Sequence, residues 1–199
     1  MATATPTLTL EARDQQAESA IAGGLAAVVL MSFLPGPVSM IGWIGTVGFM
    51  ANGIADAYGH YDAGKDNLAE RVINILLAGG TGWVLRIGGM AVLSALLSFT
   101  GIGYLGSVAI NLTIGLPMAY AVAKGAQAIY RGEMTGTQVS PDEVGEIVRN
   151  AYSAAHESGM AARVATRPAS EAEAADAMRD AMRDAERGSG DRPTGPLGE

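Results

Sequence analysis

The chain contains no cysteine and few aromatic residues, and both shortages restrict its chemistry. Without cysteine it cannot form disulfides, thiolate metal sites or a cysteine nucleophile. Aromatic residues make up 6% of the chain, and its 13 lysines and arginines form no basic patch. Nucleic-acid binding requires a clustered positive surface. We therefore expect neither thiol chemistry nor a nucleic-acid partner.

Charge is missing from three long stretches, residues 21–55, 72–85 and 87–123. Small domains bury only part of their surface, so a soluble domain of about 130 residues cannot easily hide this much apolar sequence. Segments 38–55 and 102–123 approach the roughly 20 residues that cross a bilayer. These runs predict a lipid bilayer as the surroundings of the apolar part, with about two spanning helices or with hairpins that enter without crossing.

The distribution of charge divides the chain into three parts. Residues 1–13 are small, polar and threonine-rich, which favours disorder. Residues 14–133 form the predicted membrane-associated helical domain. Residues 134–199 contain 12 acidic and 7 basic residues, and they predict an acidic soluble helical tail with a disordered end. The N-terminus lacks the basic and apolar segments of a signal peptide. We expect a bacterial cytoplasmic or intracellular membrane, with the tail in the cytoplasm.

Glycine and proline divide the sequence into helices, so the predicted fold is all-α, with glycine-rich apolar hairpins followed by an amphipathic or partly disordered helical tail. The Pro35-Gly36-Pro37 triplet predicts a turn, Gly59 and Gly132 predict helix ends, and Pro117 predicts a kink. Ser140 followed by Pro141 and two acids predicts a helix start. The expected helices cover residues 14–33, 38–58, 67–78, 83–99, 104–130, 141–158 and 170–187.

Three glycines at a spacing of three, Gly42, Gly45 and Gly48, are the first candidate interaction residues. Glycines on a helix face let another backbone approach closely. That helix belongs either to the same chain or to a second copy, so a homo-oligomer is one prediction.

Two other patterns resemble sites of chemistry. The Gly101-x-Gly103-x-x-Gly106 spacing matches a dinucleotide-binding loop, but no acidic residue follows until Glu133. A chance match is expected among 27 glycines, so we predict a tight turn and no cofactor. The cluster of Asp56, His60 and Asp62 is interrupted by the helix end at Gly59, which favours a solvated helix end over a metal site.

Arg86 is the one charge in residues 72–123, and it marks either a helix end near the interface or a buried polar site. Catalytic sets of serine, histidine and acid are missing at useful spacings. We predict no catalytic residues, no metal site and a protein that is not an enzyme.

The tail contains a tandem Ala-Met-Arg-Asp repeat at residues 177–184. Met178 and Met182 lie four residues apart on one helix face, and Asp–Arg pairs at a spacing of three support the opposite face. A narrow methionine stripe either docks a partner helix or belongs to a marginal helix that frays.

The order of features from Leu34 to Met134 resembles a known family. These features are Leu34-Pro35-Gly36-Pro37, Tyr58-Gly59, Glu70-Arg71, the glycine-rich stretch 76–80, and the small-residue segment from Tyr120 to Gly132. They are similar to the YcjF-like, GTPase-associated membrane domain family. The resemblance implies a helical membrane module without catalytic residues. The chain has no phosphate-binding loop, so a GTPase would be a separate partner.

These observations favour a non-enzymatic membrane-associated scaffold or adaptor that anchors a partner through its tail. The alternative is an oligomeric pore, a membrane-remodelling protein or a structural protein of an organelle envelope, assembled through Gly42, Gly45 and Gly48.

Overall fold

The computed structural model describes residues 8–34, 36–60 and 108–163, with residues 176, 179, 180, 182–184, 186 and 187 of the tail. Within these residues the regular structure is helical and contains no strand, which confirms the all-α prediction. The expected helices at 67–78 and 83–99, the Gly101–Gly106 pattern and Arg86 lie outside the described residues.

Helices α1 (Leu10–Ser32) and α2 (Gly36–Ala57) form a hairpin around the turn that the proline-glycine triplet predicts. Helix α1 starts earlier than expected, so residues 10–13 are helical and were wrongly assigned to a disordered segment. Thr9 caps this helix by accepting a hydrogen bond from the Ala12 amide, and Arg13 donates to the Ala57 carbonyl at 3.1 Å. At the end of α2, Gly59 has φ +87°, as predicted for a glycine that ends a helix.

The two helices of the hairpin approach closely where α1 has small residues. A Cβ placed on Gly24 would lie 2.6 Å from the Met50 Cβ, and one placed on Gly53 would lie 3.0 Å from the Ala20 Cβ. Real carbon atoms do not approach to 2.6 Å, so the backbone of α1 lies against Met50 only because Gly24 has no side chain. The hairpin therefore depends on glycine at this position.

The third long helix is continuous from Val108 to Thr135 and consists of a π-helical turn, η1 (Asn111–Gly115), followed by α7 (Leu116–Thr135). Pro117 cannot donate a backbone hydrogen bond, and its ring crowds the preceding turn, which a wider π turn accommodates. The predicted helix end at Gly132 is wrong, because α7 continues to Thr135 and ends at Gly136 with φ +74°. Gly132 instead allows contact with the returning chain: a Cβ there would lie 2.5 Å from the Thr137 carbonyl oxygen.

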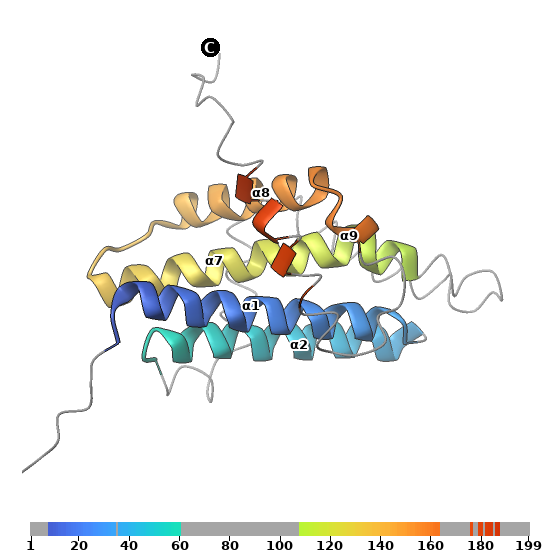
Figure 1. Cartoon of the computed structure of the whole chain (residues 1–199), viewed down its shortest axis with the longest axis horizontal. Coiled ribbons are helices and arrows are strands. Elements are labelled where there is room, and N and C mark those ends of the chain that lie inside the picture. Colours follow the sequence, from blue (N-terminus) through green and yellow to red (C-terminus); the bar gives the residue numbers. More distant parts are fainter. Residues whose placement is uncertain are drawn as a thin grey trace, which may run out of the picture.

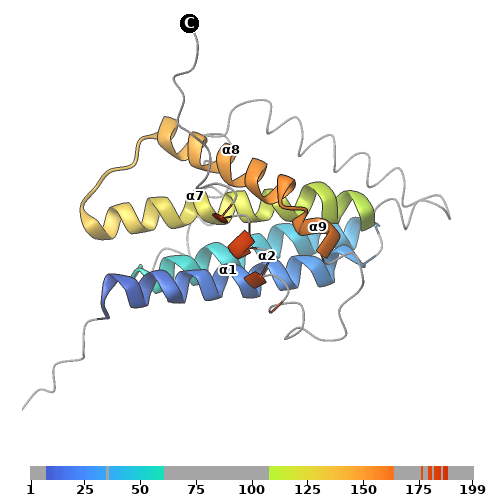
Figure 2. The ribbon, with the colours of Figure 1, turned by 45° about the horizontal axis from the view of Figure 1, so that its top comes forward.

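Helix α8 (Pro141–Glu157) starts and ends close to the predicted positions, and a short helix, α9 (Met160–Arg163), follows it. Ser140 and Glu143 form a complete capping box. Helix α8 lies along α7 on the side away from α1 and α2 (Figures 1 and 2). Its outward residues are charged or polar, whereas Val144, Val148 and Ala155 are buried. The described helices thus form layers, with α8 outermost, α7 in the middle, and α1 with α2 beyond it.

One helix of the described part, Val108–Thr135, is long and apolar enough to cross a membrane, with a mean hydropathy of 1.2. However, 67% of its most apolar window is buried inside the protein. The core helix of a soluble protein meets the same criteria of length and composition. This helix is the central helix of the described bundle, packed against α1, α2 and α8.

Candidate functional site

The charges of the bundle gather at one end of its three long helices. Helix α1 carries its charges before Ala20, whereas α2 and the 108–135 helix carry theirs near their C-terminal ends. Since α1 enters the bundle where the other two leave it, these charges meet. The Asp14 carboxylate accepts a hydrogen bond from the Tyr58 hydroxyl at 2.6 Å and pairs with Arg131 at 3.1 Å. A polar end and an uncharged end follow from this arrangement.

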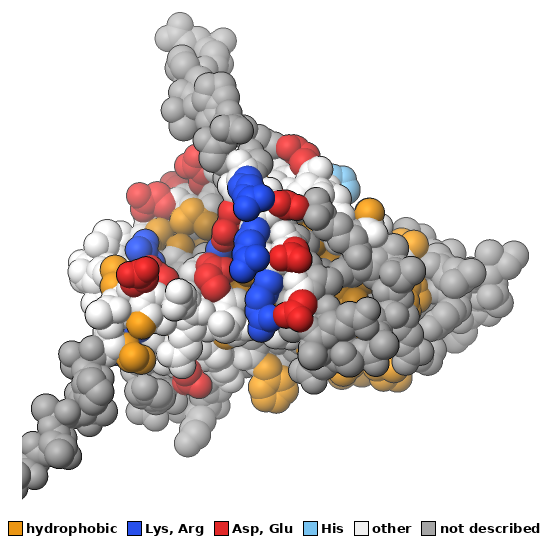
Figure 3. Space-filling view, in the orientation of Figure 1, with side chains coloured by type: hydrophobic (Ala, Val, Ile, Leu, Met, Phe, Trp, Pro, Cys, Tyr) orange, Lys and Arg blue, Asp and Glu red, His pale blue; other side chains and the backbone are white. Residues whose placement is uncertain are grey.

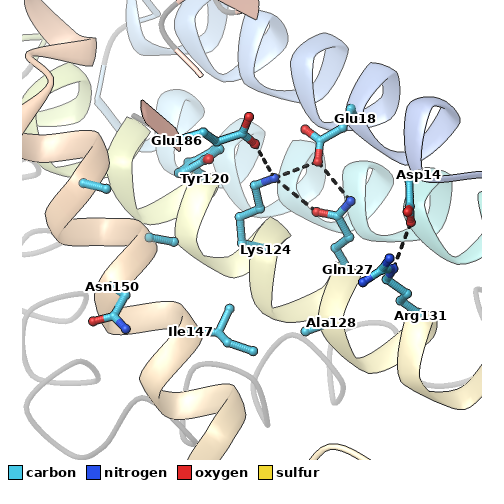
Figure 4. A pocket seen from close by; sticks show the side chains of 12 residues that line it. Asp14, Glu18, Tyr120, Lys124, Gln127, Ala128, Arg131, Ile147, Asn150 and Glu186 are labelled. Atoms are coloured by element: carbon cyan, nitrogen blue, oxygen red, sulfur yellow. Dashed lines mark hydrogen bonds and ion pairs between the residues drawn. The ribbon is translucent and has the colours of Figure 1, made fainter. Parts of the chain in front are cut away.

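Lys124 is the centre of the polar end (Figure 4). Its ammonium lies 2.7 Å from the Glu18 carboxylate of α1 and 2.8 Å from the Glu186 carboxylate of the tail. It also donates to the Gln127 side-chain oxygen at 3.3 Å, and the Gln127 amide in turn donates to Glu18 at 3.0 Å. The Lys124 side chain is 17% exposed, so these partners replace most of its water.

The environment keeps Lys124 charged. Burial on its own would lower the pKa of Lys124, but the neighbouring Tyr120 oxygen and the Glu18 and Glu186 carboxylates outweigh burial and hold that pKa above its usual range. A lysine that acts as a nucleophile needs a lowered pKa, because only the neutral amine attacks. Lys124 is therefore suited to holding an anion and unsuited to covalent catalysis.

A cavity of about 610 Å³ lies beside Lys124, between α1, α7 and α8 (Figure 4). Its lining combines charged groups of both signs with apolar side chains. The lining residues are Asp14, Glu18, Tyr120, Lys124, Gln127, Ala128, Arg131, Ile147, Asn150, Ala151, Ala154 and Glu186. Such a surface fits a ligand that carries a negative group next to an apolar one.

Two tyrosines next to this cluster are expected to ionise at unusually high pH. Burial and the hydrogen bond to Asp14 raise the pKa of Tyr58 to about 12, and burial also raises the pKa of Tyr120 above its ordinary value. Both groups favour the folded state below pH 10, and that contribution is lost as the pH rises through their folded-state pKa values.

A tyrosinate absorbance titration of the folded protein should therefore show late transitions above pH 10 among its six tyrosines. In Tyr58→Phe the transition near pH 12 should be missing, while the Tyr120 transition stays. If all tyrosines of the folded wild type ionise together near pH 10, the buried cluster is wrong.

The structure separates the three predicted glycines. Gly42 faces Met31 of α1, and a Cβ on it would lie 2.9 Å from the Met31 sulfur. Gly48 is buried, whereas Gly45 is exposed and has open space around it. A spacing of three residues turns by about 300°, so three such glycines spread over about 120° of the helix. Self-association stays a prediction, and Gly45 is the member whose surface is open to a second copy.

The tail methionine that the structure describes, Met182, is 4% exposed and belongs to the protein's own core. It is thus unavailable to another protein while the tail is seated, and Met178 lies outside the described residues. The predicted Asp176–Arg179, Asp180–Arg183 and Asp184–Arg187 pairs are confirmed. They form the column of blue side chains with red ones beside it in the centre of Figure 3.

The structure describes two of the three residues considered for a metal site, Asp56 and His60. Asp56 is exposed, and His60 pairs with Glu133 at 3.7 Å and lies 5.4 Å from the Tyr130 ring. Asp62 lies outside the described residues. In the described ranges no three histidine or acidic side chains are arranged to hold a metal ion.

A second surface, which sequence reasoning missed, is the outer face of α2. Val38, Ile41, Ile44 and Phe49 are exposed by 56%, 69%, 56% and 78%. They follow a helical spacing, and Gly45 lies among them. This α2 face has no charge before Asp56, and apolar side chains show at the lower edge of Figure 3, where α2 lies in Figure 1. The opposite side of the bundle is the charged outer face of α8.

No protein-family model matches this chain, and no curated protein or solved structure matches it.

Proposed function

We propose that the protein is a non-enzymatic, membrane-associated scaffold whose α2 face rests in a lipid bilayer and whose charged α8 side receives a partner in the cytoplasm. The exposed row of Val38, Ile41, Ile44 and Phe49, on a helix with no charge before Asp56, carries this proposal. Full burial of one such side chain is worth roughly 1.5–3 kcal/mol, so four side chains more than half exposed favour a lipid interface by several kcal/mol.

Lipid contact through the α2 side alone costs less free energy than insertion of the whole bundle into the bilayer. Helix α8 runs along the 108–135 helix, and its His156 lines a shared cavity with Leu112 and Pro117 from the uncharged half. Inserting that half completely would also carry the exposed Glu157 of α8, which follows His156, into hydrocarbon. Such a charge costs about 2.5–3.5 kcal/mol or more at the centre of a bilayer. The α2 side can enter lipid without this cost.

For the partner we propose only a class of protein. The resemblance to the GTPase-associated membrane domain family favours a separate GTPase, held at a bacterial cytoplasmic or intracellular membrane. The charged α8 surface supports docking of a water-soluble protein, because its outward residues are polar while its inner stripe is buried on α7.

Flotation with phosphatidylcholine vesicles tests the proposal. The protein should float with the vesicles, and the bound fraction should change little between roughly 0.05 and 0.5 M salt, because an uncharged face binds without ion pairs. Protein that stays at the bottom of the gradient would contradict the lipid-facing role. Binding that requires anionic lipid and disappears in salt would contradict the apolar α2 face as its cause.

A further inference from the structure

The tail segment around Met182 and Glu186 sits on the bundle in a way that the membrane role does not need. Both residues lie in helical backbone four positions apart, so they share one helix face. Met182 joins the apolar core, and Glu186 reaches Lys124 at 2.8 Å from a position 62 residues further along the chain. Met182 is 4% exposed, whereas the Glu186 side chain is 50% exposed and the side chains of the Asp–Arg pairs are 33–80% exposed. One buried side chain and one partly exposed ion pair therefore hold this segment on the bundle.

The hydrogen bonds of Lys124 indicate which chemical group could bind it in place of Glu186. An ammonium group has three donors, and Glu18, Gln127 and Glu186 take one each. Glu18 and Gln127 belong to the bundle and also bond to each other, so they stay when the tail leaves. When Glu186 leaves, one N–H donor of the mostly buried Lys124 ammonium loses its acceptor beside the cavity. A carboxylate is the acceptor that binds such a charged donor most strongly.

We propose that the cavity between α1, α7 and α8 is part of a docking groove for an amphipathic helix, and that the tail segment carrying Met182 and Glu186 is seated in this groove beside the cavity, where Glu186 forms part of the wall. The partner helix carries an apolar residue followed four positions later by a carboxylate, the pattern of Met182 and Glu186. Charge complementarity with Lys124 selects the carboxylate, and the apolar core selects the residue before it. The seated tail holds the Lys124 ammonium through Glu186 until such a helix displaces it.

A labelled peptide of residues 174–190, added to full-length protein and followed by fluorescence anisotropy, tests the groove. We expect it to bind a full-length variant with Met182→Asp and Glu186→Lys at least 10-fold more tightly than the wild type, whose own tail occupies the groove. Asp180→Asn is the matched control, since it removes an exposed carboxylate of the same segment, and it should bind the peptide as weakly as the wild type.

Changes in the peptide keep the test independent of folding. A peptide with Glu186→Gln should bind the tail-released variant at least 5-fold more weakly, and Lys124→Gln in that variant should remove the difference between the two peptides. Equal binding to the wild type and the tail-released variant, or no binding to either, would overturn the proposal. The measurement uses no membrane, so its failure would leave the lipid-facing role of α2 standing.

Discussion

Replacing Gly24 with alanine is expected to lower the free energy of unfolding by about 2 kcal/mol. The new methyl group would lie 2.6 Å from both the Cβ and the Cγ of Met50, so α1 and α2 must move apart or Met50 must leave its position. Overpacking of this kind costs about 1–3 kcal/mol, which exceeds the gain of up to about 1 kcal/mol from alanine in a helix. Urea unfolding followed by circular dichroism measures the change.

The neighbouring glycine supplies the control. A Cβ on Gly23 meets nothing within 4 Å, so Gly23→Ala should stabilise the protein by about 0.5–1 kcal/mol through helix propensity alone. The two variants add the same methyl group at adjacent positions of one helix and should change stability in opposite directions. Stabilisation by both would contradict the close contact between α1 and α2.

The double substitution of Ile41 and Phe49 by glutamate is expected to weaken vesicle binding more than 100-fold. Both side chains are more than two-thirds exposed, so the fold should tolerate the change to within about 0.5 kcal/mol. In the membrane-bound state, each substitution removes apolar contact and brings a charge to the interface. A combined loss above about 3 kcal/mol corresponds to more than a 100-fold decrease in affinity, as measured by flotation over a lipid titration.

A control variant with two glutamates at other positions distinguishes the effect of position from the effect of added charge. Gln138 follows α7 and Asn150 lies on α8 at the cavity beside Lys124, and both are exposed. Replacing both with glutamate adds the same charge as the α2 variant and should leave vesicle binding within about 3-fold of the wild type, because neither residue faces lipid. Equal weakening by the two double variants would attribute the loss to net charge and reject the α2 face.

Local signals in the sequence were sufficient to predict those helix ends that are marked by capping residues, proline or glycine. Ser140, Pro141 and Glu143 specify the start of α8, because a hydroxyl cap, a proline and an acid each suit the first turn. Gly59 ended α2 as predicted. Gly132 was misleading because a glycine both ends helices and admits close neighbours, and only the position of Thr137 shows which of the two applies.

The candidate site could not be predicted, because its partners are distant in sequence. Lys124 is separated from Glu18 by 106 residues and from Glu186 by 62 residues. The available signal was the position of Lys124 at the end of a long uncharged run, where a cation requires a partner. The α2 face was likewise hidden, since apolar residues lie on all sides of that helix and its sequence does not mark which side α1 and α7 cover.

The absence of cysteine allows the most direct test of the membrane-facing account. A single cysteine introduced at Ile41, Gly45, Phe49 or Arg149 carries the only spin label in the chain. Power saturation with oxygen and a water-soluble nickel complex, on vesicle-bound protein, then reports whether each site faces lipid or water. The account predicts oxygen-dominated labels at Ile41, Gly45 and Phe49 and a nickel-accessible label at Arg149. Nickel accessibility at all four sites, or a lipid-facing label at Arg149, would contradict it.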